Sequence, residues 1–317
     1  MFLPMNPLFK SPVRAGAPTQ IQEISHGHSL RRGRVVLWIL IHLAALTALF
    51  KFHASVIPAF FMMLFVAGCL GITIGYHRLL THGSFKTYPV VRFLLCACGT
   101  LSLFGGPVEW VGYHRRHHAH TEEERDPHSP RDGFLWAHFE WLLFRHPFDA
   151  AYYAKDVMRD KGLLFLERFS YLPPFLSLVV IYLVGTLVAH AGVAWLLWVG
   201  AVRSVLAFHS AGLVNSWTHR WGYRNFNTND DSRNSPFVAL LSFGEGWHNN
   251  HHAQQRSASH GMKPREFDVS YLVIRLMERA GLAWDVVRPD LSMLSATTEH
   301  AQTESAKVMS HEKVMTE

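Results

Sequence analysis

Residues 56–82 read VIPAFFMMLFVAGCLGITIGYHRLLTH and join a long apolar run to a pair of histidines. The apolar part, residues 56–76, contains no charged side chain and would be roughly 31 Å long as a helix, enough to cross a bilayer. His77 and His82 follow it directly. The stretch therefore predicts a membrane-spanning helix that brings two side chains able to bind a metal to one membrane surface.

Three further apolar runs predict three more spans, at residues 35–52, 172–189 and 193–214. Very short connections join the first run to the second and the third to the fourth, so the spans are expected to form two hairpins. The fourth run contains Arg203 and His209, and ionisable groups inside a span usually have a function.

The distribution of charge predicts the orientation of these spans. Charged residues make up only 17% of the chain, and the formal net charge is +6. Of the 30 Lys and Arg residues, 28 lie before the first span, between the second and third, or after the fourth. The positive-inside rule then places both termini and the active site in the cytoplasm, and we expect a bacterial inner-membrane protein. Topology explains the basic excess, so nucleic acid is not an expected partner.

The predicted fold class is all-α and integral to the membrane: four transmembrane helices in two hairpins, with a cytoplasmic helical domain. Residues 35–290, which include the four spans, are expected to form one domain, after a cytoplasmic segment at 1–34 and before a polar, disordered tail at 291–317. Within the domain, residues 89–104 predict an interfacial helix and residues 268–280 an amphipathic helix.

Histidines form three clusters next to the predicted spans. The two in the first cluster follow the second span, and a separate Asn-x-x-x-His motif follows the fourth span. In the second and third clusters the spacing i, i+3, i+4 places three imidazoles on one helix face, where they can converge on a shared centre. The candidate ligands are His77, His82, His114, His117, His118, Asn215, His219, His248, His251 and His252.

Nine imidazoles exceed the ligand set of one metal and predict two. Imidazole binds iron, zinc, copper and nickel, so ligand type alone does not select the metal. A metal transporter is disfavoured because transporters place their ligands near the bilayer midplane. A surface zinc hydrolase is disfavoured because no HExxH motif is present. Four further residues are expected to support the ligands from a second layer: His120, His128, His209 and Glu245. His138 and His260 have no patterned partner and are expected to be bystanders.

Several of these motifs resemble the membrane fatty acid desaturases, most closely the delta-9-like bacterial and plant branch. The resemblance covers roughly residues 35–285 and rests on GYHRLLTH at 75–82, WVGYHRRHH at 110–118, NSWTH at 215–219 and GEGWHNNHH at 244–252. It implies that the nine histidines bind two iron ions (Fe²⁺), forming a dimetal site in the cytoplasmic domain, and that Asn215 acts on one iron through a water.

The family resemblance also implies a reaction. Desaturation of a fatty acyl chain would consume molecular oxygen as co-substrate and introduce a cis double bond, expected at delta-9. The acyl chain would be presented as an acyl-CoA, an acyl-lipid or an acyl-carrier protein, in an apolar tunnel between the second and fourth spans. A ferredoxin or a b-type cytochrome would supply electrons. The alternative within the superfamily is an acyl-chain hydroxylase, which would give an alcohol.

One position departs from the animal and fungal acyl-CoA enzymes of this family. There an Arg-Asp pair precedes the second histidine cluster, whereas this chain has Gly112 and Tyr113. Arg115 and Arg116 are adjacent and could substitute for it. We therefore expect weaker dependence on CoA than in those enzymes.

Overall fold

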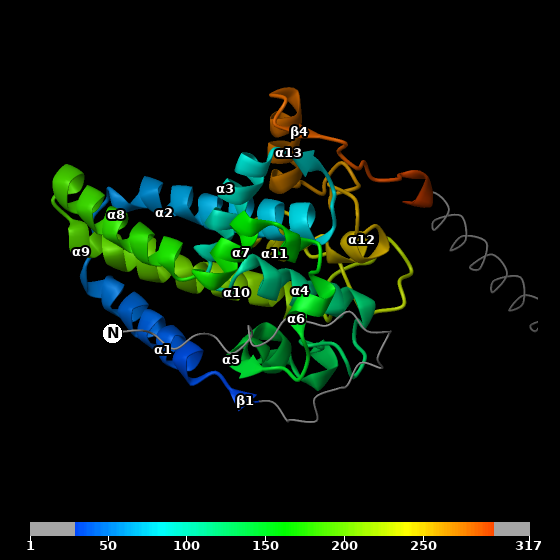
Figure 1. Ribbon diagram of the computed structural model, residues 1–317, viewed down its shortest axis with the longest axis horizontal. Coiled ribbons are helices and arrows are strands. Elements are labelled where there is room, and N and C mark those ends of the chain that lie inside the picture. The colour runs from blue at the N-terminus through cyan, green and yellow to red at the C-terminus, as the bar shows by residue number, and fades with distance from the viewer. Residues whose placement is uncertain (1–28, 295–317) are drawn as a thin grey trace, which may run out of the picture.

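The computed structural model describes residues 29–294 and is mostly helical (Figure 1). Within residues 29–294, four helices are long and apolar enough to cross a membrane: Arg32–Phe50, Val56–Thr81, Leu172–Ala189 and Gly192–Ser216. They run alongside one another as two hairpins, and the shorter elements gather near one end of this bundle (Figure 1). The prediction of four spans in two hairpins is confirmed, and we describe the chain as a membrane protein.

The surface of these helices explains why a bilayer is needed. Leu187 and Val188 of α8 (Leu172–Ala189) are each 75% exposed, and Leu46 of α1 (Arg32–Thr47) is 60% exposed. At about 25 cal/mol for each Å² of apolar surface, leaving such faces in water would be costly, whereas lipid tails cover them without cost.

The second span extends further than its apolar run suggested. It consists of α2 (Val56–Leu64) followed by the π-helical segment η3 (Phe65–Thr81), so His77 lies within the helix. Helix α3 (Pro89–Thr100) packs tightly against it: a Cβ at Gly71 would lie 2.4 Å from the backbone nitrogen of Gly99. Helix α3 is apolar but too short to span, which agrees with the prediction of an interfacial helix.

The fourth span has three parts, α9 (Gly192–Trp195), η7 (Leu196–Val202) and α10 (Arg203–Ser216). Arg203 is buried within it and donates hydrogen bonds to the carbonyls of Val199 and Leu101, so it joins this span to the end of α3.

The remaining elements are short and belong to the segments outside the spans. Those between the second and third spans are β2 (Lys86–Thr87), α4 (Pro107–Ala119), η4 (Pro130–Asp132), η5 (Trp136–Glu140), α5 (Trp141–Leu143), β3 (Phe144–Arg145), α6 (Ala150–Tyr153), η6 (Val157–Arg159) and α7 (Lys161–Arg168). Those after the fourth span are α11 (Pro236–Leu241), α12 (His248–Ala253), α13 (Val269–Arg279) and β4 (Ala283–Trp284). The turn η2 (Ala48–Phe50) ends the first span, and β1 (Ser29–Leu30) precedes it.

Two small antiparallel pairs, β1 with β3 and β2 with β4, tie these segments together. Helix α13 matches the predicted amphipathic helix at 268–280 within one residue at each end; its buried Ile274 packs in the core beside η3 and α3. The segment 1–28 and most of the predicted tail, 295–317, lie outside the described residues.

A buried arginine joins the second span to the segments that carry the third histidine cluster. Arg78 is 0% exposed and donates hydrogen bonds to Asp268, Glu245 and the carbonyl of Ala258. Removing either carboxylate would leave this cation buried with fewer partners, which typically costs about 3–5 kcal/mol. The network therefore holds the segment around α12 against the end of η3.

Candidate metal centre

All three predicted histidine clusters meet at one place, between the end of η3, helix α4 and helix α12. His77 is on η3 and His82 follows it, while the second and third clusters lie on α4 and α12. Helix α4 starts with Pro107 in its first turn, a position that does not need the missing N–H. The half-buried carboxyl of Glu167 accepts the backbone N–H of Val108 and so caps this helix.

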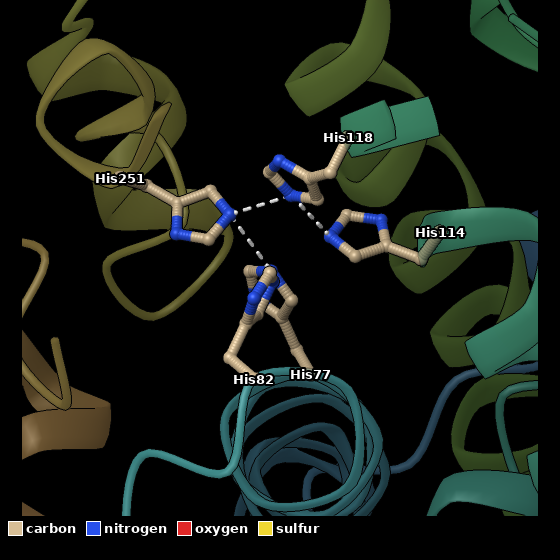
Figure 2. Close-up of side chains that lie close together, drawn as sticks. All are labelled: His77, His82, His114, His118 and His251. Atoms are coloured by element: carbon tan, nitrogen blue, oxygen red, sulfur yellow. Dashed lines mark hydrogen bonds between the residues drawn. The ribbon is translucent and has the colours of Figure 1, made fainter. Parts of the chain in front are cut away.

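The imidazoles form two groups. Site A contains His77, His82, His114, His118 and His251 (Figure 2). Site B contains His117, His219, His248 and His252. Within each group, one nitrogen from every residue lies within 4.8 Å of the others. All nine histidines proposed as ligands from the sequence are therefore brought together.

In site A the rings converge from three elements, as Figure 2 shows. The Nε2 of His251 lies 3.1 Å from that of His77 and 2.9 Å from that of His118, which is 3.0 Å from Nε2 of His114. Metal–imidazole bonds of about 2.1 Å set at right angles would place neighbouring nitrogens about 3.0 Å apart. The spacing of site A therefore fits a shared metal ion.

Site B carries a stronger indication of a cation. Nδ1–H of His219 donates to Glu122 over 2.8 Å, and Nδ1–H of His252 donates to Asp230 over 2.7 Å. In the neutral form of each ring the Nε2 atom then carries a lone pair, and both Nε2 atoms face Nε2 of His248 at 3.1 Å. One proton on His248 can satisfy only one of them. A bound cation removes the repulsion between the remaining lone pairs.

Each of the two helical clusters divides its histidines between the two sites, which corrects the expectation that they share one centre. His114 and His118 of α4 belong to site A, whereas His117 belongs to site B. The reason is helical geometry: at about 100° per residue, positions i and i+4 differ by about 40°, while i+3 and i+4 differ by about 100°. In α12 the division is reversed, with the i, i+4 pair in site B.

Four carboxylates, three of them buried and that of Asp230 half-buried, fix the orientation of four histidines. Besides Glu122 and Asp230, Asp126 accepts Nδ1–H of His117 over 2.9 Å, and Glu245 lies 2.5 Å from Nδ1 of His77. Such partners set the tautomer of a metal-binding histidine and make it a better ligand. Glu245 was expected in this layer. Glu122 and Asp230 were missed, because they follow no fixed spacing from the histidines that they hold.

Burial favours the neutral form of five of the site histidines. Desolvation, followed by neighbouring imidazoles, holds the pKa of His114, His118, His248 and His251 well below the usual value. Burial lowers the pKa of His252 to about 4 although Asp230 opposes the shift. Neutral imidazole is the form that binds a metal, so the site is ready for binding at neutral pH.

An apolar cavity of about 1010 Å³, including its open mouth, reaches the two sites. Leu64, Gly68 and Ile72 of the second span line much of it, with Trp110, Phe139 and Trp141 and most residues from Ala207 to Asn215 of the fourth span, His209 and Leu213 excepted. Its polar lining includes His77, His114, His248 and Asn215. The predicted apolar tunnel between spans two and four is thus present, and Asn215 lies on its wall.

The three histidines expected to support the ligands lie in three different places. His128 packs on His117, with 4.3 Å between ring centroids, as expected of a supporting residue. His120 and His209 were expected to support the ligands too, but their hydrogen bonds go elsewhere. His120 bonds Glu123, and His209 bonds His42 and His138.

His260 was expected to be a bystander, and that expectation is wrong. It is 0% exposed, its ring lies 4.4 Å from that of His251, and its Nδ1 lies 3.5 Å from Glu245. The sequence held a weak signal for it, because His260 lies only eight positions after His252 in a segment rich in small residues.

The arginines proposed to replace the missing Arg-Asp pair are already engaged. Arg115 pairs with Asp156 and donates to the carbonyls of Leu80, Thr81 and Tyr153. Arg116 donates to the carbonyl of Arg125 and stacks on Phe148. At Gly112 a Cβ would lie 2.2 Å from the carbonyl oxygen of Ala150, so no larger residue fits there without a shift of α6.

Comparison with known proteins identifies the family. The family model for fatty acid desaturases matches residues 54–260. An sn-1 stearoyl-lipid 9-desaturase of Anabaena variabilis is 40% identical over 255 residues, covering 79% of this chain and 91% of that protein. An sn-1 stearoyl-lipid 9-desaturase of Synechocystis sp. is 40% identical over 253 residues, covering 78% of each. An icosanoyl-CoA 5-desaturase of Limnanthes douglasii is 40% identical over 261 residues, covering 80% of this chain and 71% of that protein. The chain therefore belongs to the fatty acid desaturase family and is a fatty acyl desaturase.

Proposed function

We propose that the protein introduces a cis double bond at delta-9 of a glycerolipid acyl chain, using two iron ions and molecular oxygen. The observation that carries this proposal is the position of sites A and B at the wall of the apolar cavity. The balanced reaction is R–CH₂–CH₂–R′ + O₂ + 2 e⁻ + 2 H⁺ → R–CH=CH–R′ + 2 H₂O. The electrons would come from an external one-electron carrier.

The ligand set supports iron. The nine histidines would hold the two ions through ring nitrogens, with Asn215 acting on one of them through a water. An unactivated methylene group is too weak an acid for any side chain to deprotonate, so the metals would supply oxidising chemistry. Zinc has no redox chemistry and so could not supply it. Iron can, and imidazole is a suitable ligand for iron.

The protein's own residues bind and orient the chain. The cavity wall between α2–η3 and α10 holds the acyl chain by apolar contacts and excludes water from the methylene groups next to the site. Glu245, Asp126, Glu122 and Asp230 hold four imidazoles in place, so the metal positions are prepared before substrate enters.

A lipid-linked chain is favoured over an acyl-CoA. CoA carries several phosphates, which Arg is best shaped to bind, but Arg115 and Arg116 are occupied by other partners. The comparisons include both kinds of desaturase, since the Anabaena and Synechocystis proteins are named for acyl-lipids and the Limnanthes protein for an acyl-CoA. We also propose that both termini and the metal centre face the cytoplasm of a bacterial inner membrane, as the 28 basic residues outside the spans predicted from the sequence indicate.

Expression in a host that lacks the product, followed by fatty-acid profiling of each lipid class, tests the proposal. We expect a new delta-9 alkene in glycerolipids, and none in His118→Ala or His252→Ala protein that still inserts in the membrane. An alcohol product would indicate the hydroxylase instead. Full activity of both variants would refute the ligand assignment.

A further inference from the structure

Helix α13 begins beside the membrane-spanning part of the second span. The hydroxyl of Ser270, in the first turn of α13, is hydrogen-bonded to that of Thr73 and lies 3.5 Å from Sγ of Cys69. Both partners belong to the uncharged apolar stretch of this span, residues 56–76, and Thr73 is about one turn from its end. Helix α13 then runs across the direction of the spans (Figure 1). It therefore starts where the second span meets the membrane surface and extends along that surface.

The side of α13 that faces away from the protein core is apolar. Ile274 is buried in the core beside η3, whereas Leu272 and Leu276 are exposed, the second of them by 61%. At about 100° per residue, positions two apart point about 160° from each other, so both leucines lie opposite the buried side. Phe267, just before the helix, is 65% exposed. We call Phe267, Leu272 and Leu276 the apolar strip. Exposed apolar side chains gathered on one face mark a site of contact with a protein or a membrane.

The neighbours of the apolar strip lead back to the lipid-covered spans. Helix α3 packs along η3, and its Val90 and Leu94 are exposed. Tyr88, just before α3, packs on Trp284 of β4 with 4.9 Å between ring centroids, and both side chains are exposed. Strand β4 follows α13 after a short turn. Trp and Tyr are typical of the boundary between lipid and water. The surface from α3 to α13 therefore continues the lipid-facing surface of the second span.

The exposed charges around the apolar strip are mostly positive. Three exposed cations form no ion pair within residues 29–294: Lys263, Arg265 and Arg279. Two acidic residues of the same segment, Glu266 and Asp268, are buried. A third, Glu278, pairs with Arg275 and Arg288. A helix with an apolar face and exposed cations is typical of one that lies in the interface of a membrane, where the cations attract anionic phospholipid headgroups.

We propose that α13 docks on the membrane surface, with the apolar strip among the lipid tails and the three unpaired cations against anionic phospholipid headgroups. This docking does not depend on the proposed reaction. It holds the third histidine cluster at a fixed height, because Trp247, next to His248, donates Nε1–H to the carbonyl of Phe267 over 3.0 Å. The bilayer is favoured over a soluble protein as the occupant, because α13 starts beside the membrane-spanning stretch and its unpaired charges match anionic headgroups.

Contact quenching by lipid tests the docking. A small fluorophore is attached to Leu276→Cys in full-length protein, held in nanodiscs of equal parts phosphatidylcholine and phosphatidylglycerol. Cys98→Ala first removes the one thiol that is not fully buried. Leu187→Cys on α8 is the lipid-facing reference, and Glu124→Cys, in the loop after α4, is the water-facing reference. Bromine atoms on the lipid chains, close to the headgroups, quench only a fluorophore that lies among those chains.

We expect brominated lipid to quench the label of Leu276→Cys about as strongly as that of Leu187→Cys, and that of Glu124→Cys hardly at all. Leu272→Cys should give the same result, so the outcome does not depend on one substitution. Bromine carried by phosphatidylglycerol alone should quench the label of Leu276→Cys about twofold more than bromine carried by phosphatidylcholine alone.

Reversal of one charge tests the choice of headgroup. Arg279→Glu should remove most of the preference for brominated phosphatidylglycerol, and raised salt should weaken the preference in the unmodified sequence, because screening weakens the attraction. Arg145→Glu is the matched control. Arg145 is also exposed, but it lies on β3, which pairs with β1 on the opposite side of the molecule from α13 (Figure 1). This substitution should leave the preference unchanged.

Quenching of Leu276→Cys no stronger than that of Glu124→Cys would overturn the docking. If the label were then also shielded from iodide in the water, in particles that hold two chains, the strip would be a contact between two copies. Equal quenching by the two brominated lipids would overturn the assignment of anionic headgroups. Equal effects of Arg279→Glu and Arg145→Glu would show that net charge, and not α13, sets the lipid preference.

Discussion

Asp230→Asn should weaken iron binding at site B without unfolding the protein. The carboxylate of Asp230 accepts Nδ1–H of His252 over 2.7 Å, and also the hydroxyl of Thr228 over 2.8 Å and the N–H of Ser232 over 3.0 Å. Asparagine can keep the Thr228 and Ser232 bonds through its oxygen, but its NH₂ group then faces His252. His252 is free to move its proton to Nε2, where that proton would occupy the metal position.

Loss of such a supporting partner typically lowers metal affinity about 10- to 100-fold, which corresponds to about 1.4–2.7 kcal/mol. Iron titration of the chelated protein, followed by bound-iron analysis, measures the change directly. Activity should return at high iron concentration, since all nine histidines remain. Asp149→Asn is the control, because Asp149 caps α6 through the N–H of Ala151. Unchanged iron affinity in Asp230→Asn would show that this carboxylate does not orient the ligand.

Three other predictions concern pH, packing and topology. Burial lowers the pKa of His252 to about 4, so the unfolded chain, whose histidines have a pKa of about 6.5, binds more protons between these two values. In metal-free protein, protonation of this residue should therefore lower the free energy of unfolding by up to about 3 kcal/mol as pH falls through that range. A Tm near pH 5 equal to that near pH 7.5 would contradict this. Gly112→Ala should destabilise the contact between α4 and α6, because its Cβ would lie 2.2 Å from the carbonyl oxygen of Ala150. We expect a lower expression yield and a lower Tm. Values equal to those of the unmodified protein would show that α6 can shift at little energetic cost. Reporter fusions near residue 155 and at residue 317 should both report cytoplasm, and a signal from the opposite side would refute the proposed orientation.

Local pattern was sufficient to predict the spans and the candidate ligands. Apolar length predicts a membrane helix directly, because a bilayer demands about 20 residues whatever the rest of the fold does. For this reason the third span was predicted with the bounds that the structure has, Leu172–Ala189. The spacing of histidines within α4 and α12 likewise depends only on helix geometry, and all nine are brought together.

What only the tertiary structure decided concerns partners distant in sequence. Glu122 bonds His219, 97 positions away, and His260 lies against His251 and Glu245 in the fold. No local rule predicts such contacts, because they depend on how loops of irregular shape pack around the helices. The division of each cluster between sites A and B is of the same kind. The direction of each imidazole follows from helix geometry, but which centre it faces depends on where α4 and α12 lie relative to η3.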